Sequence, residues 1–189
     1  MVKRRTLSRE QVLDQANDII ASEGLSHLTI RALAGRLDVR PQSVYNYVDS
    51  LNDLLDQVGV TFVNEIADRL MRRLVGVAGK EALWVFAQEF RAGCKQQQHL
   101  APLLLNPNDL QQLTATHQAL VDLYQQMFKS LHLDEAGNTA LVESTLYRSA
   151  LFGFIVQEIG GFLRLPARKV DQRFDQTMQL AIDQFTTIE

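Results

Sequence analysis

Apolar residues recur at helical spacing along almost the whole of this 189-residue chain, and no segment keeps the alternation of a β-strand. After Ser8, for example, Val12, Ala16, Ile19 and Ile20 form a single helical face. Because the chain has only 10 Gly and 4 Pro, little interrupts long helices. The sequence therefore predicts an all-α protein of about nine helices.

Residues with strong capping preferences mark the ends of the first helices. Ser8 begins a capping-box pattern, and Gly24 is expected to end that first helix. Thr29 is expected to cap a second short helix, and Pro41 to occupy the first turn of a third over about 41–48. A long fourth helix is predicted after Ser50. Later helices are predicted over 83–94, from 108, from 134 to about 160, and over 170–185.

Charge is distributed unevenly along the chain. Residues 1–50 hold seven Lys and Arg against six acids, whereas residues 51–189 hold twelve against sixteen. A locally basic N-terminal end on an otherwise acidic protein indicates that this end binds an anionic partner. A solvated basic tail is the alternative.

Residues 28–48 have the pattern of a helix-turn-helix, in which two short helices are joined by a tight turn. The second helix is expected to expose amide and hydroxyl groups on Gln42, Ser43, Tyr45, Asn46 and Tyr47. Such groups can bond base edges and phosphates in the major groove of DNA. A plain pair of helices with a structural role is the alternative.

The same stretch resembles the N-terminal domain of the TetR family of bacterial transcriptional repressors. The resemblance covers about residues 8–56 and rests on the order Leu28-Thr29-x-Arg31-x-Leu33-Ala34-x-x-Leu37-x-Val39, Val44-Tyr45-x-Tyr47-Val48 and Leu54-Leu55. It implies a helix-turn-helix DNA-binding domain over residues 1–50 and a helical effector-binding and dimerisation domain over residues 51–189. It also implies a homodimer that binds a palindromic operator, usually as a repressor, and is released by a small-molecule effector.

Matched residue by residue, the resemblance places the DNA contacts on the two helices of the motif. They fall on Thr29, Ile30, Arg31, Pro41, Gln42, Ser43, Tyr45 and Tyr47. Arg31 is suited to a guanine edge and Gln42 to another base edge, whereas the hydroxyl groups are suited to phosphate oxygens. Lys3, Arg4 and Arg5 are expected to add phosphate or minor-groove contacts.

Two positions bear on how closely the chain follows the family pattern. Asp38 stands where the turn of the motif usually has Gly, and Asp tolerates the left-handed backbone conformation better than most residues. Residues 147–166 resemble the C-terminal domain of the WHG-type subgroup, but Phe152 stands where that subgroup often has His.

The last two long helices are expected to form the dimer interface, as the resemblance implies. The helix around 138–162 is apolar on more than one side, so its own chain and a partner are both expected to cover it. Ser149 and Gly153 are small and allow another helix to approach closely. The final helix is expected to contribute Val170, Phe174, Met178, Ala181 and Phe185. An ordinary monomer core is the alternative.

Candidate effector-binding residues are aromatic or polar side chains on the apolar helix faces beyond residue 80, and each has a core role as its alternative. They are Trp84, Phe90, His117, Tyr124, Phe128, Tyr147, Arg148 and Phe152. An inward Arg148 would need an acid such as Glu143 or Glu158. If neither pairs with it, an anionic ligand is favoured.

No catalytic or metal-binding pattern accompanies these features. Gly79-Lys80 lacks the rest of a phosphate-binding loop, and the four histidines lack metal-ligand spacing, so no enzyme, cofactor or metal is expected. The single cysteine, Cys94, excludes an intramolecular disulfide and fits a cytoplasmic protein. No apolar run approaches the ~20 residues of a membrane span. The alternative function is a helical regulator or interaction protein without a small-molecule effector.

Overall fold

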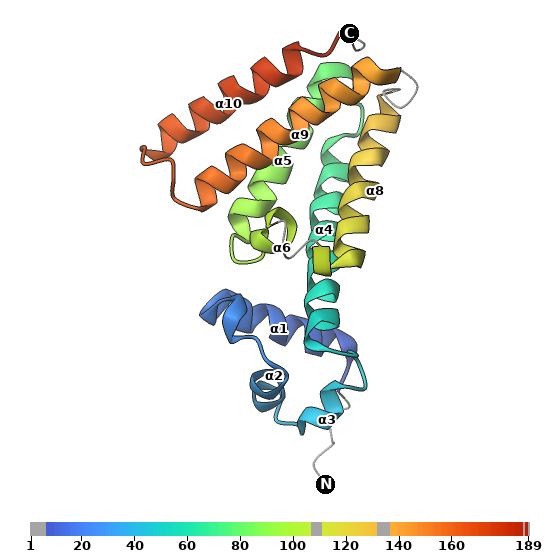
Figure 1. Cartoon of the computed structure of the whole chain (residues 1–189), viewed down its shortest axis with the longest axis vertical. Helices are drawn as coiled ribbons and strands as arrows, with labels where there is room; N and C mark the ends of the chain where they lie inside the picture. The colour runs from blue at the N-terminus through green and yellow to red at the C-terminus, as the bar shows by residue number, and fades with distance from the viewer. Residues whose placement is uncertain (1–6, 107–110, 132–136, 187, 189) are drawn as a thin grey trace. The chain divides into compact units, whose positions relative to one another are not determined.

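The computed structural model describes residues 7–106, 111–131, 137–186 and 188 (Figure 1). Within these residues it contains nine α-helices, one short 3-10 helix (η1) and no strand, which confirms the predicted all-α fold. The elements are α1 (Arg9–Glu23), η1 (Leu25–His27), α2 (Ile30–Arg36), α3 (Pro41–Val44), α4 (Leu51–Arg73), α5 (Gly79–Gln96), α6 (Ala101–Leu105), α8 (Thr114–Ser130), α9 (Gly137–Ile159) and α10 (Ala167–Asp183). None of these helices is long and apolar enough to cross a membrane.

The chain divides into two compact units. The head comprises residues 1–62 and 99–119, and the body comprises residues 63–98 and 120–189. Helices α4 and α8 therefore contribute residues to both units. The functional division after residue 50 remains a prediction.

Local capping explains where the first helices of the head begin. The Ser8 hydroxyl accepts a hydrogen bond from the Gln11 backbone N–H at 3.2 Å, and the Gln11 side chain accepts one from the Ser8 N–H at 3.0 Å. Helix α1 ends at Gly24, whose φ of 94° is open to glycine. The Thr29 hydroxyl accepts from the Ala32 N–H at 3.0 Å and starts α2. All three predicted caps are confirmed.

The turn between α2 and α3 contains Asp38 with a φ of 55°, the left-handed conformation expected there. Helix α3 begins with Pro41 as predicted but ends at Val44, whereas the sequence predicted a helix over about 41–48. The backbone tightens into a turn after Val44, where the Tyr47 N–H donates to the Val44 carbonyl at 2.9 Å. Helix α4 then begins at Leu51, directly after Ser50.

A single carboxylate fixes the first turn of α8 to α4 within the head. Asp56 accepts hydrogen bonds from the backbone N–H groups of Ala115 at 3.0 Å and Thr116 at 2.7 Å, and from the Thr116 hydroxyl at 2.7 Å. Gly59 permits this close approach, because a Cβ there would lie 2.3 Å from the Thr116 hydroxyl oxygen. Thr116 is therefore fully buried, and the next residue, His117, faces outward.

The core of the body lies between α5, α9 and α10, and α9 and α10 lie side by side in Figure 1. All five residues that the final helix was expected to contribute to the dimer interface are buried inside this core. They are Val170, Phe174, Met178, Ala181 and Phe185. Their side chains pack within the chain itself, and the expectation that they also meet a partner chain remains a prediction.

Candidate DNA-binding and effector sites

The helix-turn-helix presents most of its predicted DNA-contact side chains on the surface of the head. Thr29, Arg31, Pro41, Gln42 and Tyr45 are exposed, while Ile30, Ser43 and Tyr47 are half-buried. Beneath them Leu33, Ala34 and Val44 are buried and hold α2 and α3 together. The motif thus offers a polar outer surface on an apolar base.

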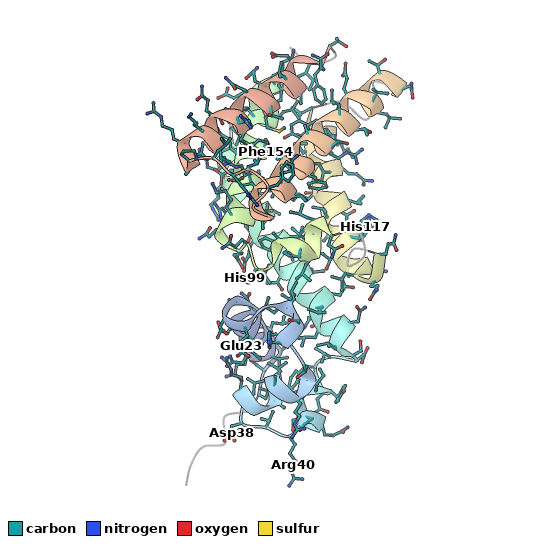
Figure 2. The ribbon with its side chains drawn as sticks, turned by 60° about the vertical axis from the view of Figure 1, so that its left-hand side comes forward. Glu23, Asp38, Arg40, His99, His117 and Phe154 are labelled. Atoms are coloured by element: carbon teal, nitrogen blue, oxygen red, sulfur yellow. The ribbon has the colours of Figure 1, made fainter. Side chains whose placement is uncertain are left out.

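Three arginines of the motif differ in their partners. Arg36 is paired with Glu23 of α1. Arg31 and Arg40 form no ion pair within the part of the chain that the structure describes. Figure 2 shows the Arg40 side chain pointing away from the head, beside the turn at Asp38. Arg40 was not among the predicted contacts, although its place directly before Pro41 could have indicated it.

Two of the predicted contact residues have partners inside the chain. The Thr29 hydroxyl is used as the cap of α2. The Tyr47 hydroxyl donates to the backbone carbonyl of Leu7, so its proton is not directed to a phosphate as expected. Tyr45, which is 46% exposed, makes no such bond among the described residues. The predicted contacts at Lys3, Arg4 and Arg5 lie outside the described residues.

In the body, four phenylalanine rings gather around one tyrosine, and these five residues from three helices form what we call the aromatic cluster. Its members are Phe86, Phe90, Tyr124, Phe128 and Phe152. The Tyr124 ring lies 4.9, 6.0, 6.1 and 5.7 Å from the centroids of Phe86, Phe90, Phe128 and Phe152, respectively. The rings of Phe128 and Phe152 are half-buried, so the cluster reaches the surface on their side.

The two buried tyrosines of the body differ in their hydrogen bonding. The Tyr147 hydroxyl donates to the Leu83 carbonyl at 2.6 Å. The Tyr124 hydroxyl is buried and finds no hydrogen-bond partner among the described residues. Burial raises the pKa of both hydroxyls well above the usual range, so both stay protonated at ordinary pH. Tyr124 therefore holds an unused donor inside an apolar cluster.

Arg148 lies half-buried on α9, one turn before Phe152. Among the described residues its guanidinium bonds within its own helix, to the Ser144 carbonyl and the Thr145 hydroxyl, each at 3.3 Å. The acids considered as partners are engaged elsewhere. Glu143 accepts from the Thr186 N–H at 3.0 Å, and Glu158 accepts from Arg91 at 2.7 Å.

The structure brings five of the eight predicted effector residues together: Phe90, Tyr124, Phe128, Tyr147 and Phe152. Trp84 is half-buried and makes no ring contact with them within the described chain. His117 belongs to the head and is exposed (Figure 2), so its predicted place on the inner face of α8 is wrong. Phe86 was missed, although its spacing of one turn from Phe90 could have indicated it.

An ion network with a mostly buried Arg91–Glu158 pair joins α5, α9 and α10. The Arg91 guanidinium donates to both oxygens of Glu158 at 2.7 Å and to Asp171 at 2.6 Å, and it lies 4.5 Å from the centre of the Phe174 ring. Lys95 lies 3.0 Å from Glu158. Burial alone would raise the pKa of Glu158, but the hydrogen bonds and charges of Arg91 and Lys95 lower it below its ordinary value.

Helix α9 also has an exposed apolar stripe opposite its buried face. Its members are Val142, Leu146, Ser149, Gly153 and Val156, which follow one another at alternating steps of four and three residues. A Cβ placed on Gly153 would meet no atom within 4 Å. The prediction that this helix is apolar on two sides is confirmed, and the second side is uncovered in the protomer.

Neither a metal site nor a reactive cysteine is found in the described parts of the chain. No group of three or more His, Cys, Asp or Glu there could hold a metal ion. Cys94 is buried, and burial raises its pKa to about 12, which keeps the thiol protonated.

The chain is similar to bacterial transcriptional regulators, although no protein-family model matches it. It is 31% identical over 161 residues to Rv0681 of Mycobacterium tuberculosis, an uncharacterized HTH-type transcriptional regulator. That match covers 83% of this chain and 72% of the relative. A second match, to the HTH-type regulator YobS of Bacillus subtilis, is 22% identical and covers 82% of this chain and 81% of the relative.

Solved structures share the fold at lower identity. The regulator FadR of Bacillus subtilis, in complex with stearoyl-CoA, superposes with a TM-score of 0.72 at 12% identity, over 94% of this chain and 100% of that one. A TetR-family protein of Vibrio parahaemolyticus superposes with a TM-score of 0.65 at 18% identity, over 96% and 98% of the two chains. The chain therefore belongs to the HTH-type transcriptional regulators, and its fold is that of the TetR-family regulators.

Proposed function

We propose that the protein is a homodimeric repressor, whose residues 1–50 bind a palindromic DNA operator and whose residues 51–189 dimerise and bind a small-molecule effector that releases the operator. The observation that carries this proposal is the exposed polar surface of α2 and α3. It combines two arginines without an ion-pair partner in the described chain, Arg31 and Arg40, with Gln42 and Tyr45. Unpaired arginines favour phosphates and guanine edges, and an exposed amide can bond a base edge.

The exposed stripe of α9 supports dimerisation with a second copy of the chain. Apolar side chains at this spacing cover one side of a helix, and the small residues Ser149 and Gly153 leave room for an opposing helix. Leu146 remains 45% exposed in the protomer, so it gains from being covered. A dimer also brings two heads to half-sites about 34–36 Å apart on DNA.

The aromatic cluster supports effector binding in the body. It combines a mostly apolar lining with a buried donor, Tyr124, and a half-buried cation, Arg148, as small-molecule sites commonly do. The stearoyl-CoA held by the FadR structure is a further reason to expect a ligand in a protein of this fold.

Footprinting of DNA upstream of the protein's own gene, at two salt concentrations, tests the proposal. We expect a protected, roughly palindromic site whose affinity falls as the salt concentration rises. Arg31→Ala is expected to lose about 1–3 kcal/mol of discrimination at one base position. Arg36→Ala is the matched control, because Arg36 is already paired with Glu23. Absence of protection at low salt would favour the alternative of a helical interaction protein that does not use the head on this DNA.

A further inference from the structure

We propose that the aromatic cluster binds an apolar carboxylate, whose oxygens are taken by the Tyr124 hydroxyl and the Arg148 guanidinium. That this ligand is the effector rests on the function proposed above. The assignment of its chemical class rests on the residues of the body alone.

The first argument is the unused donor on Tyr124. Its side chain is 4% exposed and surrounded by four phenylalanine rings, yet its hydroxyl has no partner among the described residues. A buried hydroxyl without a hydrogen bond is costly, and phenylalanine at this position would avoid that cost. Tyr147 shows the ordinary solution, because its hydroxyl is bonded to the Leu83 carbonyl. A ligand oxygen that accepts from Tyr124 gives the hydroxyl its missing partner.

The second argument is the charge beside that donor. Arg148 lies one turn before Phe152 on α9, and the Phe152 ring lies 5.7 Å from the Tyr124 ring, which places the arginine beside the cluster. Its charge lowers the pKa of Tyr124 against the larger effect of burial. No carboxylate of the described chain pairs with Arg148, because Glu143 and Glu158 are bound elsewhere. A half-buried guanidinium without an acid favours an anion.

Together the two groups select a carboxylate rather than another polar group. The guanidinium only donates and the Tyr124 hydroxyl can donate as well, so a ligand group that supplies two acceptors satisfies both. A carboxylate has two oxygens and can accept from both at once. One cation balances one negative charge, which favours a carboxylate over a phosphate ester.

The rest of the ligand is expected to be apolar. The aromatic rings of the cluster come from α5, α8 and α9, so its surface is apolar. Phe128 and Phe152 are half-buried at its edge. We expect the apolar part of the ligand to pack against these two rings and to replace their contact with water by apolar contact. Aromatic or medium-chain aliphatic acids fit this description.

The test is isothermal titration calorimetry of the full-length protein with 1-naphthoate and decanoate, each compared with its uncharged amide. We expect at least one acid to bind about tenfold or more tightly than its amide, the difference of one charge-assisted hydrogen bond. Arg148→Gln is expected to abolish that preference. Arg72→Gln removes the same charge from an exposed site of α4 and should leave the preference intact.

Tyr124→Phe separates a binding role from a structural one. It is expected to weaken acid binding about tenfold while the midpoint of thermal unfolding stays level or rises, because no protein hydrogen bond is lost. Tyr147→Phe, which loses the bond to Leu83, should lower that midpoint. A fall for Tyr124→Phe as large as that for Tyr147→Phe would overturn the proposal.

Two further results would also overturn it: equal binding of acid and amide, or no binding of either acid at millimolar concentration. Release of a labelled operator fragment, measured on the same protein, separates this proposal from the proposed function. Acid binding that depends on Arg148 but leaves the operator bound supports the site and contradicts the effector role. If an uncharged compound releases the operator equally well from the wild type and from Arg148→Gln, the effector role is supported and the carboxylate site is overturned.

Discussion

The ion network of the body predicts a large and pH-dependent cost for Glu158→Gln. Glu158 accepts two hydrogen bonds from the Arg91 guanidinium at 2.7 Å and lies 3.0 Å from Lys95. The substitution keeps the shape of the side chain and removes its charge. It leaves two cations near each other, with Asp171 as the remaining acid.

The magnitude follows from the burial of the pair. The Arg91 and Glu158 side chains are 10% and 13% exposed. Removing one partner of a buried ion pair costs about 3–5 kcal/mol. The substituted amide would still offer one acceptor and Asp171 would still face Arg91, so we expect the free energy of unfolding to fall by about 2–3 kcal/mol.

The pH dependence has a definite sign. The pKa of Glu158 is lower in the folded protein than its ordinary value of 4.5, because Arg91 and Lys95 outweigh the opposing effect of burial. Such a carboxylate contributes stability above its unfolded pKa and loses it as the pH falls through its folded pKa. The difference between wild type and Glu158→Gln should therefore be full at pH 7 and shrink below about pH 4.5.

Urea denaturation at a fixed protein concentration, followed by circular dichroism, measures both effects. Glu89→Gln is the matched control, since Glu89 pairs with Arg73 at 3.1 Å and with Arg69 at 3.6 Å, but these arginine side chains are 64% and 32% exposed. We expect the control to cost about 0–1 kcal/mol. Equal losses for the two variants at pH 7 would refute the reasoning, as would a difference that does not change with pH.

Three other predictions follow from contacts described above. Leu146→Arg should give a monomer by sedimentation velocity with unchanged helicity, because the side chain is exposed in the protomer; an unaltered dimer would exclude the α9 stripe as the interface. Tyr47→Phe should lower the free energy of unfolding by about 0.5–1.5 kcal/mol, because the bond to the Leu7 carbonyl is lost. Tyr45→Phe should leave the free energy of unfolding unchanged and weaken binding to all operator sequences alike. A change in base preference for Tyr45→Phe would contradict its phosphate role. Gly59→Ala should cost about 1–3 kcal/mol in urea denaturation despite alanine's helix preference, because its Cβ would overlap Thr116; a more stable variant would show that the contact relaxes freely.

Features fixed by neighbouring residues could be predicted from the sequence. The capping box at Ser8, the cap at Thr29 and the left-handed turn at Asp38 each depend on backbone atoms only a few residues away. The surface of the helix-turn-helix followed from these ends and from apolar spacing. The length of α3 did not, because apolar spacing continues to Val48 whereas the backbone tightens into a turn after Val44.

Features fixed by distant residues could not be predicted from the helical spacing of apolar residues. The spacing on α8 favoured His117 as the inward residue, but Thr116 is buried instead because Asp56 binds it. The Arg91 network likewise joins residues up to 80 positions apart. In both cases a polar side chain lies inside only because a particular partner meets it, and spacing does not reveal partners.

The contrast between neighbouring and distant residues also applies to α9 and α10. The two apolar faces of α9 could be predicted from the sequence, whereas what the apolar face of α10 packs against could not. A helix apolar on both sides must be covered on both sides, so the second face of α9 was visible in the sequence. The stripe from Val170 to Phe185 has only one apolar face, and the sequence does not say whether that face meets its own chain or another.

The carboxylate of Asp56 has a consequence for the order in which the chain folds. It caps a helix whose first turn lies 60 positions further along the chain, so the start of α8 is not encoded by its own neighbours. During synthesis α4 emerges before α8, and the first turn of α8 gains its cap only after the intervening chain has brought Thr116 back to Asp56. We expect that turn to be among the last parts of the head to form. Substitutions there should therefore change the folding rate little, which means low φ-values in folding kinetics.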